Sequence, residues 1–160
     1  MLGQLLSVVG KKEEAIQVLE IAKEQNPDSV VLALNLANQY AELERYEEGI
    51  QVLEDVLKQV PGDTGAQTNI LRMLSDNKRN KEAIERGAQW LKEKPSSTLQ
   101  AILGVILVRD HQYKLAKEIL TASLEDEIPR EHVHRSLGHI ALIEERTSQA
   151  IEEYERELRL

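Results

Sequence analysis

The sequence predicts an all-α fold, an α-solenoid of stacked antiparallel helix pairs, on two observations. Prolines recur 34 residues apart, and between them apolar residues follow the period of a helix. These prolines are Pro27, Pro61, Pro95 and Pro129. A sequence period of this length is typical of helical repeats. Because one helix pair cannot bury its apolar face alone, successive units are expected to stack on one another.

The second unit, about residues 30–63, has the most regular pattern. Its first helix is expected to reach about Leu43 and its second to end near Val60, with a turn at residues 44–46. Asp28 or Ser29 is expected to cap the first helix, since their side chains accept the unpaired N–H groups of a first turn. The spacing predicts a buried face made of Ala33, Leu36, Ala37 and Tyr40, and of Ile50, Leu53 and Leu57 on the second helix.

Small residues occupy matching sites on the two helices of four units. Such residues are expected where two helix axes approach closely, and large ones where the space opens. The expected small pairs are Gly3 with Ala15, Ala37 with Gly49, Gly104 with Ala116, and Gly138 with Ala150.

These sites form a motif that recurs along the whole chain. One copy reads Leu36-Ala37, Tyr40, Tyr46, Gly49-Ile50, Leu53 and Pro61, and others contain Leu2-Gly3, Leu103-Gly104 and Leu137-Gly138. The pattern resembles the tetratricopeptide repeat family. The resemblance implies a right-handed superhelix in which the first helix of each pair lines a concave face. It also implies a non-enzymatic scaffold that binds a partner protein without a cofactor.

On this resemblance, residues 1–160 form a single solenoid domain of five units, of which the first and last are incomplete. The expected units are about 1–29, 30–63, 64–96, 97–130 and 131–160. Because the first helix lacks its opening and the last has no covering helix, we expect a piece of a longer chain.

Helices are expected at about 1–9, 12–25, 97–109, 113–126, 130–144 and 147–160, besides those of the second and third units. Asp63-Thr64 and Thr147-Ser148 are expected to cap helices. The third unit departs from the motif, with Gly87 at a large site and Trp90 at a small one. Either Trp90 fills the volume that Gly87 leaves, or the helix kinks at Gly87.

Composition argues against several classes of function. The formal net charge is −8, so clustered cations for nucleic-acid backbones or anionic membranes are not expected. Zero cysteines exclude disulfides and Cys-ligated zinc, and fit a cytoplasmic location. The longest apolar run, residues 101–108, is far shorter than the roughly 20 residues of a membrane span. The partner is therefore expected to be a protein or an extended peptide.

The exposed stripe of the first helices is the expected binding surface. Asn side chains carry both a donor and an acceptor for a peptide backbone, and Arg side chains bind carboxylates. The expected partner-binding residues are Asn35, Asn38, Asn69, Arg72, Ile102, Val105, Arg109, Arg135 and His139. The alternative interpretation is a solvated face without a ligand.

Some members of the family hold a C-terminal carboxylate with two Lys, two Asn and one Arg. Asn38 and Asn69 match that set, but Leu34, Thr98 and Ile102 stand at its charged sites. Binding of this kind is therefore not expected. His132, His134 and His139 lack the spacing of a metal site, and no phosphate-binding loop is present.

Two other functions stay open. One is self-association, as a homodimer, through the N-terminal edge or through an exposed stripe on the last helix, formed by Ala150, Ile151, Tyr154 and Leu158. The other is a regulatory arm of an enzyme whose catalytic domain lies outside this chain. The Glu-rich runs, including residues 152–157, are interpreted as solvated surface.

Overall fold

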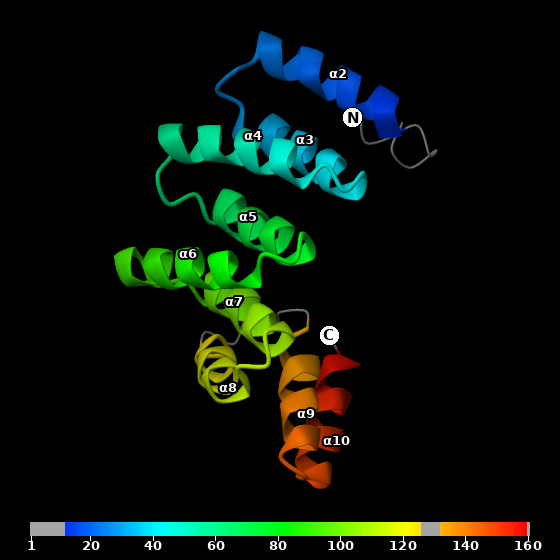
Figure 1. Cartoon of the computed structure of the whole chain (residues 1–160), viewed down its shortest axis with the longest axis vertical. Coiled ribbons are helices and arrows are strands. Elements are labelled where there is room, and N and C mark those ends of the chain that lie inside the picture. Colours follow the sequence, from blue (N-terminus) through cyan, green and yellow to red (C-terminus); the bar gives the residue numbers. More distant parts are fainter. Residues whose placement is uncertain (1–11, 126–131, 160) are drawn as a thin grey trace. The chain divides into compact units, whose positions relative to one another are not determined.

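The computed structural model describes residues 12–125 and 132–159, and within them the regular secondary structure is helical (Figure 1). The helices are α2 (Lys12–Gln25), α3 (Val30–Glu42), α4 (Tyr46–Gln59), α5 (Thr64–Asp76), α6 (Asn80–Glu93), α7 (Ser97–Arg109), α8 (Tyr113–Ala122), α9 (Val133–Ile143) and α10 (Thr147–Glu157). The all-α prediction is confirmed. Among the described residues, none of the helices is long and apolar enough to cross a membrane.

The chain divides into two compact parts, an N-terminal half (residues 1–78) and a C-terminal half (residues 79–160). In the N-terminal half, α3 packs against α2, α4 and α5. In the C-terminal half, α7 packs against α6, α8 and α9, and α9 also packs against α10, which lies beside it (Figure 1). The predicted pairs α3 with α4, α7 with α8 and α9 with α10 are therefore formed.

Aliphatic side chains at the predicted helical spacing build a core in each half. Ile16, Leu19, Leu36 and Tyr40 cluster in the N-terminal half. The C-terminal half has a larger cluster, formed by Ala101, Leu103, Leu107, Ala116, Leu120, Val133 and Ile140. The buried set predicted for residues 33–53 is confirmed, whereas Leu57 is only half-buried and Val56 takes the buried position.

Two of the predicted caps are confirmed and one is wrong. The side chains of Ser29 and Asp63 accept hydrogen bonds from the backbone N–H groups of Leu32 and Ala66, at 3.3 and 2.8 Å. Thr147 does not cap α10, because it is already the first residue of that helix. Arg146 occupies the cap position there without a side-chain hydrogen bond.

The turn inside each helix pair explains why a side-chain cap is not needed there. Glu44, His111 and Glu145 have φ values of 59°, 60° and 59°, in the left-handed region. In each turn the next residue donates its N–H to a carbonyl five positions back, as in Arg146 to Ala141 at 2.8 Å. This arrangement is a Schellman motif, which ends one helix and leads directly into the next.

Two helix ends differ from the prediction, and two predicted segments lie outside the described residues. The helix expected to reach residue 126 ends at Ala122, and the buried hydroxyl of Ser123 donates to the Leu120 carbonyl at 2.7 Å. The last helix ends at Glu157. The helix predicted for residues 1–9, with Gly3, and the start of the helix predicted from residue 130 lie outside the described residues.

The small-residue sites bring helices close together, but their glycines also face large side chains. A Cβ at Gly49 would lie 3.1 Å from the Ala37 carbonyl oxygen, as the expected pair requires, and 2.9 Å from Met73 Sδ. A Cβ at Gly104 would lie 2.5 Å from Leu120 Cγ, and one at Gly138 would lie 3.1 Å from the Tyr154 ring. Gly104 and Gly138 therefore receive the residue one turn beyond the expected alanine.

The irregular third unit keeps its second helix intact. Helix α6 continues through Gly87, which is buried. Trp90 is half-buried, and the Arg86 guanidinium lies 4.9 Å from the centre of its ring.

Candidate partner-binding site

In the N-terminal half, the predicted binding residues lie on two helices that contact each other, α3 and α5. The side chains of Asn38 and Arg72 are exposed, and those of Asn35 and Asn69 are half-buried. A Cβ at Gly65 would lie 3.4 Å from Leu34 Cδ1, so the start of α5 lies directly against α3. These four polar residues therefore lie on adjacent helices of the N-terminal half.

In the C-terminal half, a pocket of about 440 Å³ lies between α7 and α9, and α10 contributes one residue to its lining. Its lining residues are Val105, Val108, Arg109, His132, Arg135, Ser136, His139 and Tyr154. Four of the predicted binding residues, Val105, Arg109, Arg135 and His139, are therefore brought together. Ile102 is half-buried on α7 and is not among the lining residues.

Helical spacing explains why these side chains share the pocket. On α7, residues 105, 108 and 109 recur at i, i+3 and i+4 and so lie on one face. On α9 and its cap, residues 132, 135, 136 and 139 do the same. The predicted binding residues did not include Val108, His132, Ser136 or Tyr154. Tyr154 was expected to be bare on α10, but it packs over Gly138 instead.

The first turn of α9 is held by a carboxylate from the far end of α10. The backbone N–H of His132 donates to Glu157 Oε1 at 2.8 Å, and that of Arg135 donates to Oε2 at 3.2 Å. His132 itself has a φ of 69° and gives no side-chain cap. Glu157 thus satisfies N–H groups that a local Ser or Asp would otherwise satisfy. It fixes the backbone from which His132 and Arg135 extend.

Glu153 corrects the interpretation of the Glu-rich run as solvated surface. Its side chain is buried, and Nδ1 of His134 donates to its Oε2 at 2.7 Å. Arg156 donates to its other oxygen at 3.1 Å. The helical pattern missed both Glu153 and Glu157, because it treats Glu as exposed and does not show which helix lies opposite. His134 therefore faces α10 rather than the pocket.

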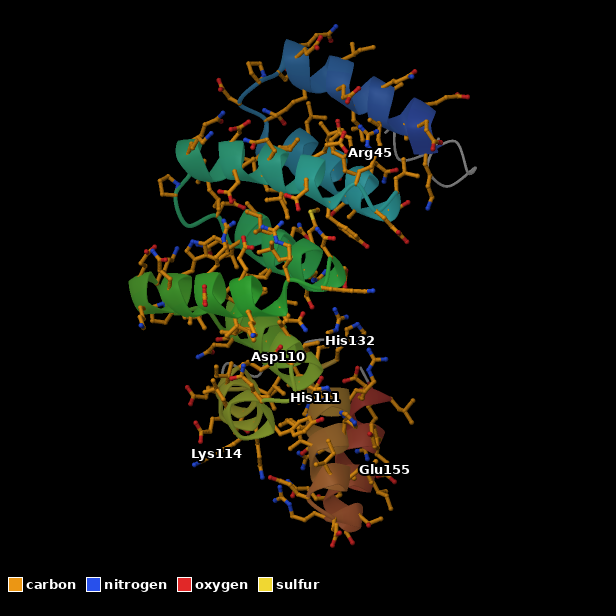
Figure 2. All side chains as sticks on the ribbon, viewed as in Figure 1. Arg45, Asp110, His111, Lys114, His132 and Glu155 are labelled. Atoms are coloured by element: carbon orange, nitrogen blue, oxygen red, sulfur yellow. The ribbon has the colours of Figure 1, made fainter. Side chains whose placement is uncertain are left out.

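Polar and aromatic contacts surround the histidines of the pocket. The Arg135 guanidinium donates to His132 Nδ1, which lies 3.6 Å from Glu157 Oε1. The ring of His139 meets that of Tyr113 edge-on at 6.2 Å between centres. His111, before α8, is hydrogen-bonded to the Tyr113 hydroxyl at 2.7 Å; Figure 2 labels His111 and His132. Among the described residues, no group of three or more His, Asp or Glu side chains is placed to hold a metal ion.

The pocket therefore joins two guanidinium groups and two imidazoles to an apolar surface from Val105, Val108 and Tyr154. Such a surface in a chain of net charge −8 is suited to an anionic group that carries an apolar neighbour.

Comparison with known proteins assigns the fold. Residues 9–74 match the family model described as tetratricopeptide repeat. Curated proteins give no match. Among solved structures, a thermophilic TPR protein of Thermus thermophilus is 17% identical, with a TM-score of 0.76 over 99% of this chain and 87% of that one. MamA 41-end from Desulfovibrio magneticus RS-1 is 19% identical, with a TM-score of 0.72 over 99% of this chain and 90% of that one.

Proposed function

Because the chain is a tetratricopeptide repeat protein, with the family motif at residues 9–74 and the fold of such proteins throughout, we propose that it is a scaffold that binds another protein. Proteins of this family are generally interaction scaffolds and typically not catalysts. The proposed partner, a protein or an extended peptide, binds the exposed faces of α3, α5, α7 and α9. The five-unit division of residues 1–160 belongs to the same proposal.

The observation that carries the proposal is the pocket between α7 and α9. It collects four residues that the family resemblance and the helical spacing together had marked as a binding face, and it combines cations with apolar surface. Pockets that bind specifically have this composition, with a few polar groups that orient a ligand over an apolar lining. In the N-terminal half, Asn35, Asn38 and Asn69 supply amides suited to a peptide backbone.

Affinity capture with quantitative mass spectrometry tests the proposal. The bait proteins are the wild type, the double variant Asn69→Ala with Arg72→Ala, and a control, Gln51→Ala with Glu118→Ala, whose two sites are exposed on α4 and α8. We expect the control to retain the partners of the wild type and the α5 variant to lose them. Equal recovery from all three baits would contradict binding at this face.

Self-association through α10 is the second candidate, and specific side chains favour it. Ile151 and Leu158 are 54% and 87% exposed, more than is usual for large aliphatic residues. Light scattering over a hundredfold concentration range separates the two functions. A constant monomer mass excludes the homodimer, whereas a mass that doubles with concentration and returns to the monomer in an Ile151→Lys variant supports it.

A further inference from the structure

We propose that the junction between α8 and α9 is a polar hinge, formed by Lys117 and Glu144, about which the last helix pair opens and closes. In α2, α4, α6 and α8, the residue that follows a buried small residue marks one equivalent site. The small residues are Ala15, Gly49, Ala83 and Ala116. The site holds Ile16 in α2, Ile50 in α4 and Ile84 in α6, but Lys117 in α8. The hinge therefore stands where three other helices have an aliphatic side chain.

In other junctions, the isoleucine at this site packs against the next helix. Ile16 clusters with Leu36 of α3, and Leu43, the residue at the end of α3, packs against the same cluster. Ile84 packs against the core cluster that contains Leu103 of α7. An aliphatic side chain stabilises such a junction through the apolar surface that it removes from water.

Lys117 forms an ion pair with the next helix instead. Its Nζ lies 3.2 Å from Oε2 of Glu144, the residue at the end of α9, and the two side chains are 34% and 38% exposed. An ion pair with this access to water contributes less than a buried isoleucine and is weakened by salt. Helix α8 also has 10 residues where α2, α4 and α6 have 14, so it offers α9 about 6 Å less of its length.

A cleft lies beside this ion pair, while the rest of α9 is fixed in the core. The cleft has a volume of about 580 Å³ and is lined by one face of α8, including Lys117, and by Glu144. Val133 and Ile140 of α9 are 0% and 1% exposed and belong to the core cluster shared with α7 and α8. The end of α9 at Glu144 therefore has room to move, with Val133 as the pivot.

Movement about the hinge changes the candidate binding site. Arg135 and His139 line the pocket from α9, whereas Val105 and Arg109 line it from α7. The distance between these two walls depends on the angle between α9 and the pair α7–α8. A ligand that contacts both walls favours the angle at which it binds best.

Distances between spin labels on introduced cysteines test the hinge, since the chain has no cysteine of its own. One pair of labels, Leu115→Cys with Ser148→Cys, spans the junction of α8 with the last helix pair. The matched control, Glu14→Cys with Glu47→Cys, has the equivalent positions on α2 and α4, and all four sites are exposed. We expect the first pair to give the broader distance distribution. It should broaden further as the NaCl concentration rises from about 0.01 M to about 1 M, and the control should not.

A variant that replaces the ion pair with apolar side chains should close the hinge. Lys117→Ile with Glu144→Leu copies the residues that stand at the junction of α2 with α3, Ile16 and Leu43. We expect its distance distribution to narrow to that of the control pair and to lose its dependence on salt. Amide exchange in α10 should slow at least about tenfold, because two aliphatic side chains are then buried at the junction. Lys92→Ile, at an exposed site on α6, should leave this exchange unchanged.

Two results would overturn the hinge. The first is a distribution for the α8 pair of labels that is as narrow as the control and insensitive to salt, which is decisive whether or not the double variant folds. The second is a broad distribution that neither salt nor the double variant alters, with circular dichroism showing that the variant is folded. Either result leaves the proposed scaffold function as it stands.

Discussion

Glu157, the last residue of α10, accepts a 2.8 Å hydrogen bond from the backbone N–H of His132, the residue that precedes α9. One carboxylate therefore joins the two ends of the last helix pair. Because His132 and Arg135 both line the pocket, the same contact connects the stability of this pair to the shape of the candidate site.

Glu157→Ala should destabilise the C-terminal half, residues 79–160. The change leaves the N–H groups of His132 and Arg135 without their acceptor and removes a negative charge from a helix N-terminus. We expect a loss of about 1–2 kcal/mol, the usual range for a helix cap. Urea unfolding measures it. Glu152→Ala, at an exposed position of the same helix, is the control and should change stability by less than about 0.5 kcal/mol. Equal midpoints for the two variants would show that the cap contributes nothing.

Tyr40 should make the stability fall in alkaline solution. Burial, and then the hydrogen bond to Glu20 at 2.5 Å, raise the pKa of the Tyr40 hydroxyl to about 12. The folded state thus holds this proton more tightly than the unfolded state, whose tyrosine has the ordinary pKa of 10.0. The stabilisation is fully present below about pH 10 and is lost as the pH rises towards 12.

Unfolding midpoints measured from pH 9 to pH 12 test this dependence. Tyr40→Phe has no hydroxyl to titrate, so its curve should decline less steeply than that of the wild type. It should also be less stable at neutral pH by about 1 kcal/mol, because the bond to Glu20 is gone. Parallel curves for the two proteins would assign the alkaline decline to other groups.

Gly104→Ala should overpack the contact between α7 and α8. The new Cβ would lie 2.5 Å from Cγ of Leu120, a side chain with no exposed surface. We expect a loss of about 1–3 kcal/mol, measured by thermal unfolding. Adding Leu120→Val removes atoms at this contact and should restore part of the loss. A Gly104→Ala protein as stable as the wild type would mean that the two helices separate at little cost.

Glu145→Gly should stabilise the last helix pair. Glu145 has a φ of 59°, a conformation that glycine adopts without steric cost. Relief of this strain outweighs the extra freedom of glycine in the unfolded chain, for a net gain of up to about 1 kcal/mol. The matched control is Glu152→Gly inside α10, which should lose about 1 kcal/mol. Destabilisation by both changes would contradict the left-handed turn.

Much of the fold was predictable because its determinants are local. The 34-residue spacing of the prolines and the apolar periodicity locate helix pairs without knowledge of any distant contact. Ser29 and Asp63 cap helices that begin just after them, so a short stretch of sequence was sufficient. The cap at α10 was mispredicted because the left-handed turn at Glu145 ends one helix and starts the next without a capping side chain.

The candidate site was predictable only where it follows the helical period. Val105, Arg109, Arg135 and His139 were identified by their offset along α7 and α9, and the structure brings them to one pocket. Tyr154 and Glu157 were missed because their roles depend on how α10 packs on α9, which the period of one helix does not specify.

Hydrogen exchange of the complex with a captured partner tests the central claim most directly. If the chain is a scaffold that uses the exposed faces of its first helices, binding should slow amide exchange in α3, α5, α7 and α9. Exchange in α4, α8 and α10 should change much less. Protection confined to these second helices, or spread evenly over the chain, would contradict the proposed binding face.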